Sequence, residues 1–368
     1  MLKPLILGLG LSGKAAFRLF LTKGIVPITY DDACPTPVDF SKVSRVIVSP
    51  GFRQEHPMIV AAKAHQIPVE SEIDLALAEL KSSYIIGITG SNGKSTVVKK
   101  IEHVLNVLNV QALALGNIEV PLSSAVLHPP TVAIIELSAQ QLETTNCSVL
   151  DLAVILNIQP NHLDRYQTME NYTKAKGKIF DLVKEGGVRL GPDVSLQEIF
   201  SVVAKKWDLS MEKIESALIS YQNLPHRLEY LGDFFGKKIY NDSKSTTFSA
   251  TLYALGQVKG PIQLIFGGKS KGEKLETIKE ELKGYFLKRV LVRVLAIGET
   301  TLEIASLLGS DLDVVVCNTL EKAVEEGLKG EGTLLFSPGF ASYDQFHSFT
   351  HRGETFKQRI EWKKKMPS

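Results

Sequence analysis

The strongest constraint on the fold is the alternation of short apolar runs with helical patterns along nearly the whole chain. Strand-length runs that alternate with helices predict βαβ units and parallel sheets. Because the runs are apolar at consecutive positions, we expect strands that helices cover on both faces. The sequence therefore predicts the α/β class with a doubly wound architecture. The runs are Pro4–Leu9, Val46–Val48, Tyr84–Thr89, Val132–Leu137, Leu152–Ile158, Ile262–Phe266, Val290–Ile297, Val314–Cys317 and Thr333–Phe336.

The length of 368 residues exceeds what one hydrophobic core supports. Two glycine-rich turns, Gly8–Gly13 and Gly90–Thr96, each follow an apolar run and open a helical pattern, so each needs its own sheet. A new series of strand runs begins after the amphipathic segment Met211–Leu218. We therefore predict a Rossmann-like domain over residues 1–82, a P-loop-like domain over 83–224 and a second Rossmann-like domain over 225–368.

Composition excludes several classes of protein. The 42 Lys and Arg residues nearly balance 40 Asp and Glu residues, so the chain lacks the broad positive field that nucleic acids select. No apolar run approaches the length of about 18 residues that a membrane-spanning helix needs. Three separated cysteines form no C-x-x-C pair and support neither a disulfide framework nor a zinc site. We expect a cytoplasmic protein with no membrane span and no nucleic-acid partner.

The first glycine-rich turn, Gly8–Gly13, fits G-x-G-x-x-G, and Asp31 follows at about the spacing of a ribose-binding acid. Amides at the helix N-terminus would hold a phosphate group there. The alternative is a tight strand-to-helix turn without a ligand, and a nicotinamide cofactor is one of several possibilities. The candidate ligand contacts are Gly10, Leu11, Ser12 and Asp31.

The second turn resembles a P-loop, although Ile88 stands where that motif has its first glycine. Backbone amides and Lys94 would cradle triphosphate oxygens, and Ser95 or Thr96 would offer a hydroxyl to Mg²⁺. The pattern therefore predicts an ATP site. Its candidate residues are Gly90, Ser91, Asn92, Gly93, Lys94, Ser95 and Thr96.

Two further polar segments, Glu136–Glu143 and Asn157–Asp164, each follow a buried strand. Ligands of α/β proteins bind at the carboxyl ends of parallel strands, so Glu136 and His162 are candidate Mg²⁺ ligands. Histidine is an unusual ligand for a cation that prefers oxygen, and a structural role for His162 is the alternative. We expect Glu143 to be a helix-surface or capping residue.

Six segments occur in the order found in the Mur ligases, and the chain resembles that family from about residue 5 to about residue 360. A C-terminal segment with Arg352 and Gly353 resembles the branch that adds D-glutamate. The segments are Thr89–Thr96, Glu136–Glu143, Asn157–Tyr166, Leu224–Glu229, Asn241–Thr246 and Ser337–Phe346.

The resemblance implies an ATP-dependent amide ligase of peptidoglycan precursor synthesis, which joins D-glutamate to UDP-N-acetylmuramoyl-L-alanine through an acyl phosphate. It also implies Mg²⁺ at two sites, a carbamylated lysine and a monomer. Such catalysis consists largely of positioning and charge neutralisation.

The resemblance also assigns roles to individual residues. Lys94, His162, Lys176 and Arg227 would be catalytic, and Ser95, Glu136, His162 and Lys176 would hold the metal, with Lys176 as the carbamylated lysine. His226, Arg227 and Asp242 would complete the ATP site. The remaining contacts to the UDP-linked substrate and D-glutamate would come from Ser49, Asn117, Lys244, Thr246, Lys271, Ser342, Tyr343 and Phe349.

Two other functions remain open. The segment from Lys178 to Trp207 is shorter than in the family, so a non-catalytic or impaired relative that binds nucleotide or precursor is one alternative. Retention of Lys94, Glu136, His162 and Arg227 argues against it. A dehydrogenase that uses the Gly8–Gly13 turn is the other alternative, but it would leave the Lys94 loop without a task.

Overall fold

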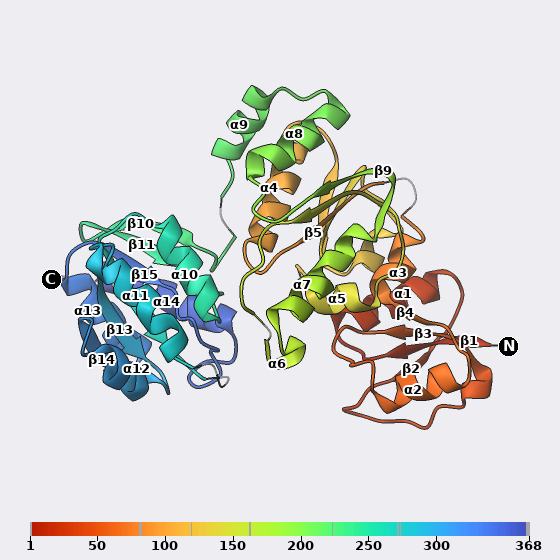
Figure 1. The fold of residues 1–368 in the computed structure, drawn as a ribbon, viewed down its shortest axis with the longest axis horizontal. Coiled ribbons are helices and arrows are strands. Elements are labelled where there is room, and N and C mark those ends of the chain that lie inside the picture. Colours follow the sequence, from red (N-terminus) through yellow and green to blue (C-terminus); the bar gives the residue numbers. More distant parts are fainter. Residues whose placement is uncertain are drawn as a thin grey trace. The chain divides into compact units, whose positions relative to one another are not determined.

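The structure is a computed structural model that describes residues 2–80, 83–118, 120–161, 163–222, 224–270, 272 and 274–365. It divides into two compact units, Met1–Tyr221 and Gln222–Ser368 (Figure 1). His162 and Lys271 lie outside the described residues, so the roles predicted for them remain predictions. Among the described residues, no helix combines the length and apolar character that crossing a membrane requires.

The first sheet of the first unit is parallel, in the order β2-β1-β3-β4. Side chains that alternate along β1 point to opposite faces: Leu5 and Leu7 pack with Ile59 of α2, whereas Ile6 packs with Leu19 of α1. Helices therefore cover both faces, as the continuous apolar runs predict. The elements are β1 Lys3–Leu7, α1 Leu11–Thr22, β2 Ile28–Tyr30, η1 Phe40–Lys42, β3 Val43–Val48, α2 Pro57–Ala64, β4 Val69–Ser71 and α3 Glu72–Leu77.

The second sheet of this unit is also parallel, in the order β6-β7-β5-β8-β9. Its central strand β5 directs Ile86 and Ile88 toward α4 and α8, and Ile85 toward α3. The elements are β5 Tyr84–Thr89, α4 Lys94–Val107, β6 Ala112–Gly116, η2 Leu122–Ala125, β7 Val132–Glu136, α5 Ala139–Thr144, β8 Leu150–Ile155, α6 Leu163–Tyr166, α7 Met169–Gly177, η3 Lys178–Phe180, β9 Val183–Leu190, α8 Leu196–Trp207 and α9 Met211–Ile219.

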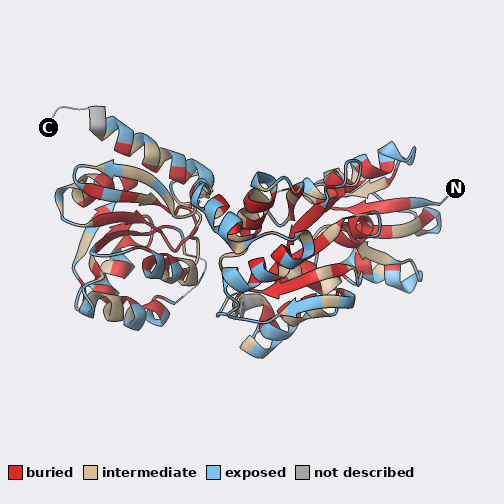
Figure 2. Ribbon diagram, turned by 90° about the horizontal axis from the view of Figure 1, so that it is seen from above, coloured by how far each residue is buried: buried red, intermediate tan, exposed pale blue. Residues whose placement is uncertain are grey.

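The second unit contains one sheet in the order β10-β11-β15-β12-β13-β14, in which only the edge strand β10 is antiparallel to its neighbour among the described strands. Figure 2 shows buried strands and helices with exposed outer faces in both units. The elements are β10 Glu229–Phe234, β11 Lys237–Asn241, α10 Phe248–Gln257, β12 Ile262–Gly267, α11 Glu276–Leu287, β13 Leu291–Ile297, α12 Thr301–Leu308, β14 Val314–Asn318, α13 Leu320–Lys329, β15 Thr333–Phe336 and α14 Phe349–Lys365.

The predicted α/β class is confirmed, and every apolar run named above coincides with a strand. Three of the strands that the sequence analysis did not predict, β2, β9 and β10, are mostly half-buried or exposed and lack a continuous apolar run. Each predicted domain contains one sheet, but the first two domains share a hydrophobic core in which Ile73 and Leu77 of α3 pack with Ile85. The division into three domains therefore stays our proposal.

The Gly8–Gly13 turn packs α1 directly against the end of β1. Gly8 adopts a φ of +87°, which favours glycine. A Cβ on Gly13 would lie 1.8 Å from the carbonyl oxygen of Gly8, far inside any allowed contact. A Cβ on Gly10 would meet nothing within 4 Å. The third glycine of this motif is therefore required by packing between the helix and the strand.

Gly13→Ala should lower the stability of the first unit by about 1–3 kcal/mol, because the added methyl group forces α1 away from β1. Urea denaturation followed by circular dichroism measures this change. Gly10→Ala is the matched control and should leave the denaturation midpoint nearly unchanged, because its φ of −68° is ordinary and the space beside it is open. Equal midpoints for the two variants would contradict this account of the turn.

Candidate active site

The loop between β5 and α4 is held in place by its own backbone and by one neighbouring segment. Gly90 and Gly93 adopt φ values of +157° and +81°. The amide nitrogen of Asn92 donates to Asn157 Oδ1 at 2.9 Å, and Ser91 Oγ donates to the carbonyl oxygen of Gln159 at 2.9 Å. Gly93 is the N-cap of α4 and has no side chain to cap the helix. The helix N-terminus is therefore suited to an anion such as a phosphate.

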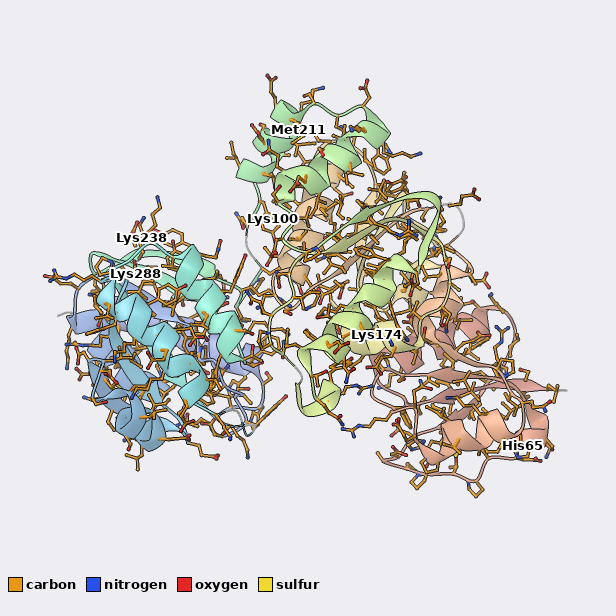
Figure 3. The ribbon with its side chains drawn as sticks, viewed as in Figure 1. His65, Lys100, Lys174, Met211, Lys238 and Lys288 are labelled. Atoms are coloured by element: carbon orange, nitrogen blue, oxygen red, sulfur yellow. The ribbon has the colours of Figure 1, made fainter. Side chains whose placement is uncertain are left out.

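Two lysine amines converge on this loop. Lys94 Nζ donates to the carbonyl oxygens of Gly90 at 2.7 Å and Ser91 at 3.0 Å. Lys176 Nζ, which comes from α7, donates to the same Gly90 oxygen at 2.9 Å. Only 1% of Lys176 is exposed, although Lys174 on the same helix, labelled in Figure 3, is exposed. Burial, and secondarily the charge on Lys94, lowers the pKa of Lys176 to about 7.

Glu136 lies at the end of β7 beside the loop and is almost fully buried. Its carboxylate accepts hydrogen bonds from Ser95 Oγ at 2.5 Å and from Asn117 Nδ2 at 2.9 Å. Across the described ranges, no group of three or more His, Cys, Asp or Glu side chains forms a metal cage. One carboxylate beside one hydroxyl fits Mg²⁺, which binds through one or two carboxylates, water and substrate phosphates.

A cavity of about 400 Å³ joins these groups to the first sheet. Pro50 and Gly51 come from the loop after β3 of the first sheet. Lys94 at the start of α4, Asn117 after β6 and Lys176 on α7 come from the part of the chain that forms the second sheet. The predicted residues Lys94, Asn117 and Lys176 therefore meet in one cavity. Its lining residues are Pro50, Gly51, Lys94, Asn117, Ser138, Ala139, Gln140, Asn161, Tyr172 and Lys176.

At the carboxyl edge of the first sheet, the predicted substrate contacts surround the Gly8–Gly13 turn. Asp31 Oδ2 accepts from the amide nitrogen of Leu9 at 2.7 Å, and Oδ1 accepts from that of Ala33 at 3.0 Å. These two backbone donors lower the pKa of Asp31. Ser49 Oγ donates to the carbonyl oxygen of Gly8 at 3.0 Å. Leu11 is 64% exposed. Asp31 and Ser49 thus fix the turn that carries Gly10, Leu11 and Ser12.

In the second unit, Asp242 organises the segment that follows β11. Its buried carboxylate accepts from Ser245 Oγ at 2.5 Å, Ser337 Oγ at 2.7 Å and the amide nitrogen of Leu228 at 3.0 Å. Burial raises the pKa of Asp242 to about 6, against the effect of these donors. The next residue but one, Lys244, donates its backbone N–H to the carbonyl oxygen of His226 at 3.0 Å.

The other predicted residues of this unit lie near the same segment or in the loop after β15. Lys244 Nζ lies 3.8 Å above the ring of Phe349. His226 is buried at a φ of +62°, with Nε2 3.2 Å from Glu354 Oε1, and burial lowers its pKa. Ser342 is buried and Tyr343 is 69% exposed. Arg227 and Thr246 are half-buried.

Arg352 was noticed in the sequence only as part of a family segment, and the structure gives it a larger role. Its buried guanidinium donates to Ser243 Oγ, and to the carbonyl oxygens of Ser243, Phe340 and Ala341, at 2.9–3.2 Å. It therefore ties the segment after β11 to the loop that carries Ser342. A Cβ on Gly353 would lie 2.2 Å from His226 Nδ1, so the neighbouring glycine lets α14 approach that ring.

Glu143 departs from its expected surface or capping role. Its carboxylate accepts two hydrogen bonds from the guanidinium of Arg165 and one from Tyr166 Oη. Its side chain is 22% exposed. The periodic pattern around Glu143 did not reveal these partners because they lie on α6, more than twenty residues along the chain.

Comparisons with known proteins agree on one family. Residues 88–269 match the Mur ligase middle domain. The chain is 31% identical to the UDP-N-acetylmuramoylalanine–D-glutamate ligase of Protochlamydia amoebophila over 440 residues, covering 98% of both chains. It is also 31% identical to the ligase of the same name from Aquifex aeolicus, with 98% of this chain and 99% of the relative covered.

Among solved structures, MurF ligase from Thermotoga maritima in complex with ADP superposes with a TM-score of 0.58 at 17% identity. The match covers 87% of this chain and 90% of that one. At this identity the likeness concerns the fold alone. The alignment of 440 residues with the Protochlamydia ligase exceeds the 368 residues of this chain, so that relative contains segments that this chain lacks.

Replacing Lys176 should change how stability depends on pH. The pKa of about 7 lies below the ordinary value of 10.5, so the unfolded chain binds more protons between these values. Burying the protonated amine lowers the free energy of unfolding by its full amount below pH 7, and this penalty disappears as the pH rises toward 10.5. Relative to Lys176→Met, the wild type should therefore gain up to about 1.4 kcal/mol per pH unit in this window.

Urea denaturation of both proteins in CO₂-free buffer, at several pH values across that window, measures the difference. Lys174→Met is the control, since its exposed amine should contribute no such slope. A stability difference between wild type and Lys176→Met that stays constant with pH would show that the amine keeps an ordinary pKa.

Proposed function

Because this chain belongs to the family of UDP-N-acetylmuramoylalanine–D-glutamate ligases, we propose that it joins D-glutamate to UDP-N-acetylmuramoyl-L-alanine with conversion of ATP to ADP. The reaction is an amide-bond synthesis in peptidoglycan precursor formation. As in the sequence-based expectation, we place it in the cytoplasm and assign it to a monomer. Among the observations on this chain, the cavity that joins the Pro50–Gly51 loop to Lys94, Asn117 and Lys176 carries the proposal.

The chemistry requires activation of the substrate carboxylate, because a carboxylate does not condense with an amine in water. Transfer of the γ-phosphoryl group to that carboxylate would give an acyl phosphate, which the amine of D-glutamate attacks with release of phosphate. The transferred group carries negative charge on its oxygens. We assign Lys94 and the backbone amides at the N-terminus of α4 to these oxygens, because Asn157 and Gln159 already fix the loop that leads into this helix.

Mg²⁺ would neutralise charge on the phosphate oxygens. Ser95 and Glu136 are the described residues that fit it best, since their oxygens already lie 2.5 Å apart. Asn117 orients the second carboxylate oxygen of Glu136 and stands at the cavity, so we propose that it links the metal site to the substrate. We retain His162 as a further proposed Mg²⁺ ligand, and we retain Mg²⁺ at two sites.

In the second unit, we propose that His226, Arg227 and Asp242 complete the ATP site. The Asp242 carboxylate would act by holding its segment in place, since Ser245, Ser337 and Leu228 already occupy it. D-glutamate must be held by two carboxylates while its amine stays free, which calls for cationic and hydroxyl donors. Lys244, Thr246, Lys271, Ser342, Tyr343 and Phe349 are our proposed contacts.

A second candidate function is binding of nucleotide or precursor without catalysis. The observation that favours it is the shortness of the chain relative to the Protochlamydia ligase. Such a protein would bind UDP-N-acetylmuramoyl-L-alanine and ATP but release no ADP when D-glutamate is added. The intact arrangement of Lys94, Ser95 and Glu136 supports the ligase instead.

The ligase predicts ADP release that requires both UDP-N-acetylmuramoyl-L-alanine and D-glutamate, with L-glutamate a poor replacement. Lys94→Met should reduce this turnover at least about 1,000-fold, because a cation aimed at the phosphate oxygens contributes mainly in the transition state. A coupled assay for ADP, with circular dichroism as a check on folding, measures both effects.

Lys99→Met is the matched control on the same helix, since Lys99 pairs with Glu102 rather than with the loop. It should retain near-normal turnover. Near-normal ADP release by Lys94→Met would contradict the role of Lys94 at the phosphate oxygens. Wild-type protein that binds both substrates without ADP release would favour the non-catalytic candidate.

Lys176 has the properties that carbamylation requires, and we propose that it carries a carbamate. The neutral amine attacks CO₂, an N–C bond forms and one proton leaves to solvent. A pKa of about 7 keeps much of the amine neutral at physiological pH. The resulting carboxylate would offer oxygen to Mg²⁺ near Glu136, which a protonated lysine cannot do.

Activity should therefore fall in CO₂-depleted buffer and return when bicarbonate is added. Lys176→Ala should lose most activity and regain part of it with a small carboxylate such as formate or acetate. The mass of the intact protein under bicarbonate offers a second readout. Full activity of Lys176→Ala, or no response to CO₂, would contradict the carbamate.

A further inference from the structure

Helix α3 carries two buried carboxylates that take no part in the chemistry described above. Glu72 is 4% exposed and Asp74 is 6% exposed. Acidic side chains are seldom buried without partners, because desolvation disfavours their charge. Burial indeed raises the pKa of Glu72. Helix α3 follows β4 of the first sheet, but the backbone partners of both carboxylates include loops of the second sheet.

Glu72 holds the segment that contains Asn117. Its Oε1 accepts from the amide nitrogen of Ser123 at 2.6 Å, and Ser123 belongs to η2. This element follows a turn closed by a hydrogen bond from the amide nitrogen of Gly116 to the carbonyl oxygen of Val120 at 2.7 Å. Asn117 lies within this turn and lines the cavity. Glu72 therefore anchors the far end of a segment whose near end is in the proposed site.

Asp74 holds a second segment in the same way. Its Oδ1 accepts from the amide nitrogens of Asn146 at 2.7 Å and Cys147 at 3.1 Å, just beyond the end of α5. The beginning of this segment, Ser138–Gln140, lines the cavity. The other oxygen of Asp74 accepts from the amide nitrogen of Ser71 at 3.5 Å, which completes the N-terminal cap of α3, and from Ser71 Oγ at 3.0 Å.

We propose that Glu72 and Asp74, the α3 carboxylate pair, are positioning residues that set the affinity for the UDP-linked substrate. They fix segments 117–125 and 138–147 relative to α3. Because α3 continues directly from β4 of the first sheet, this also fixes them relative to the Pro50–Gly51 loop, which lines the same cavity. A substrate that contacts both this loop and these segments should bind less well when they are displaced by about 1 Å relative to each other.

Apolar contacts around α3 stabilise its packing independently of the two carboxylates, so the positioning role can be tested without unfolding the protein. Ile73, Ala76 and Leu77 pack with Leu122 and Ala125 of η2 in one core cluster. These contacts remain when a carboxylate is replaced. The hydrogen bonds to charged acceptors add direction, which apolar contacts do not supply.

The test rests on the proposed function and compares KM with kcat. Glu72→Leu and Asp74→Leu remove the acceptors and should each raise the KM for UDP-N-acetylmuramoyl-L-alanine about tenfold, with kcat at saturation changed less than about twofold. The KM for ATP should stay within about twofold, because Asn157 and Gln159 hold its loop. Glu72→Gln keeps a carbonyl acceptor and should recover most of the affinity.

Glu70→Leu is the matched control, since Glu70 lies two residues before Glu72 and pairs with Arg45 at 3.4 Å on the partly exposed edge of β4. Glu70→Leu should leave kcat and the KM values for both UDP-N-acetylmuramoyl-L-alanine and ATP unchanged. A fall in kcat with unchanged KM in the α3 variants, or an equal effect of Glu70→Leu, would overturn the proposal. An inactive wild type would contradict the proposed ligase function rather than the positioning.

Hydrogen exchange gives a readout that does not depend on activity. In the wild type, peptides that cover residues 120–126 and 144–148 should be protected well beyond exposed loops such as 32–38. Glu72→Leu should release the first peptide and Asp74→Leu the second. Loop-like exchange of both peptides in the wild type would overturn the proposal even if neither variant folds.

Discussion

Two lysine amines share one backbone carbonyl oxygen, and the rest of the candidate site is arranged around that constraint. Lys94 and Lys176 both donate to Gly90, and the charge on Lys94 opposes a second charge on Lys176. Burial acts in the same direction. The arrangement therefore favours either a neutral amine on α7 or the arrival of negative charge between the two lysines. Triphosphate oxygens and a carbamate are both anions that would satisfy it.

Topology explains why these groups meet. In the order β6-β7-β5-β8-β9, the strand with the glycine loop lies between the strand that ends at Glu136 and the strand that leads to Asn157. The carboxyl ends of parallel neighbours open onto one edge, where α/β proteins bind ligands. The loop, its supporting amide and the Glu136 carboxylate thus come together without any long-range pairing beyond the sheet itself.

Much of this edge could be predicted from the sequence, because glycines, apolar strands and the polar residues that follow them are local signals. Lys94, Ser95 and Glu136 were found in this way. The burial of Lys176 could not be predicted, since Lys174 on the same helix and Lys178, which begins η3, are lysines of the same local pattern and are exposed. Lys176 is distinguished by the contacts of its amine with the Tyr172 ring on the same helix and with the Gly90 carbonyl oxygen of the loop. The resemblance to the family singled out Lys176, and periodicity did not.

The same limit applies to long-range hydrogen bonds. Asp242 and Arg352 each bring together segments about one hundred residues apart, and no spacing rule connects them. The capping box of α3 shows the converse case. Ser71 and Asp74 match a local helix-start pattern, yet the second oxygen of Asp74 reaches the loop beyond α5.

The sequence boundary near Ser82–Ser83 and the single compact unit over Met1–Tyr221 describe different properties. The boundary separates two sheets, each with its own glycine turn. The unit reflects α3, whose apolar side chains enter the core of the second sheet and whose carboxylates bind that sheet's loops. All six residues of α3 are buried, so the helix contacts both sheets and links them. In the positioning that we propose, α3 thereby holds together the cavity-lining segments of the two sheets, and the affinity for a ligand that contacts both depends on groups that do not touch it.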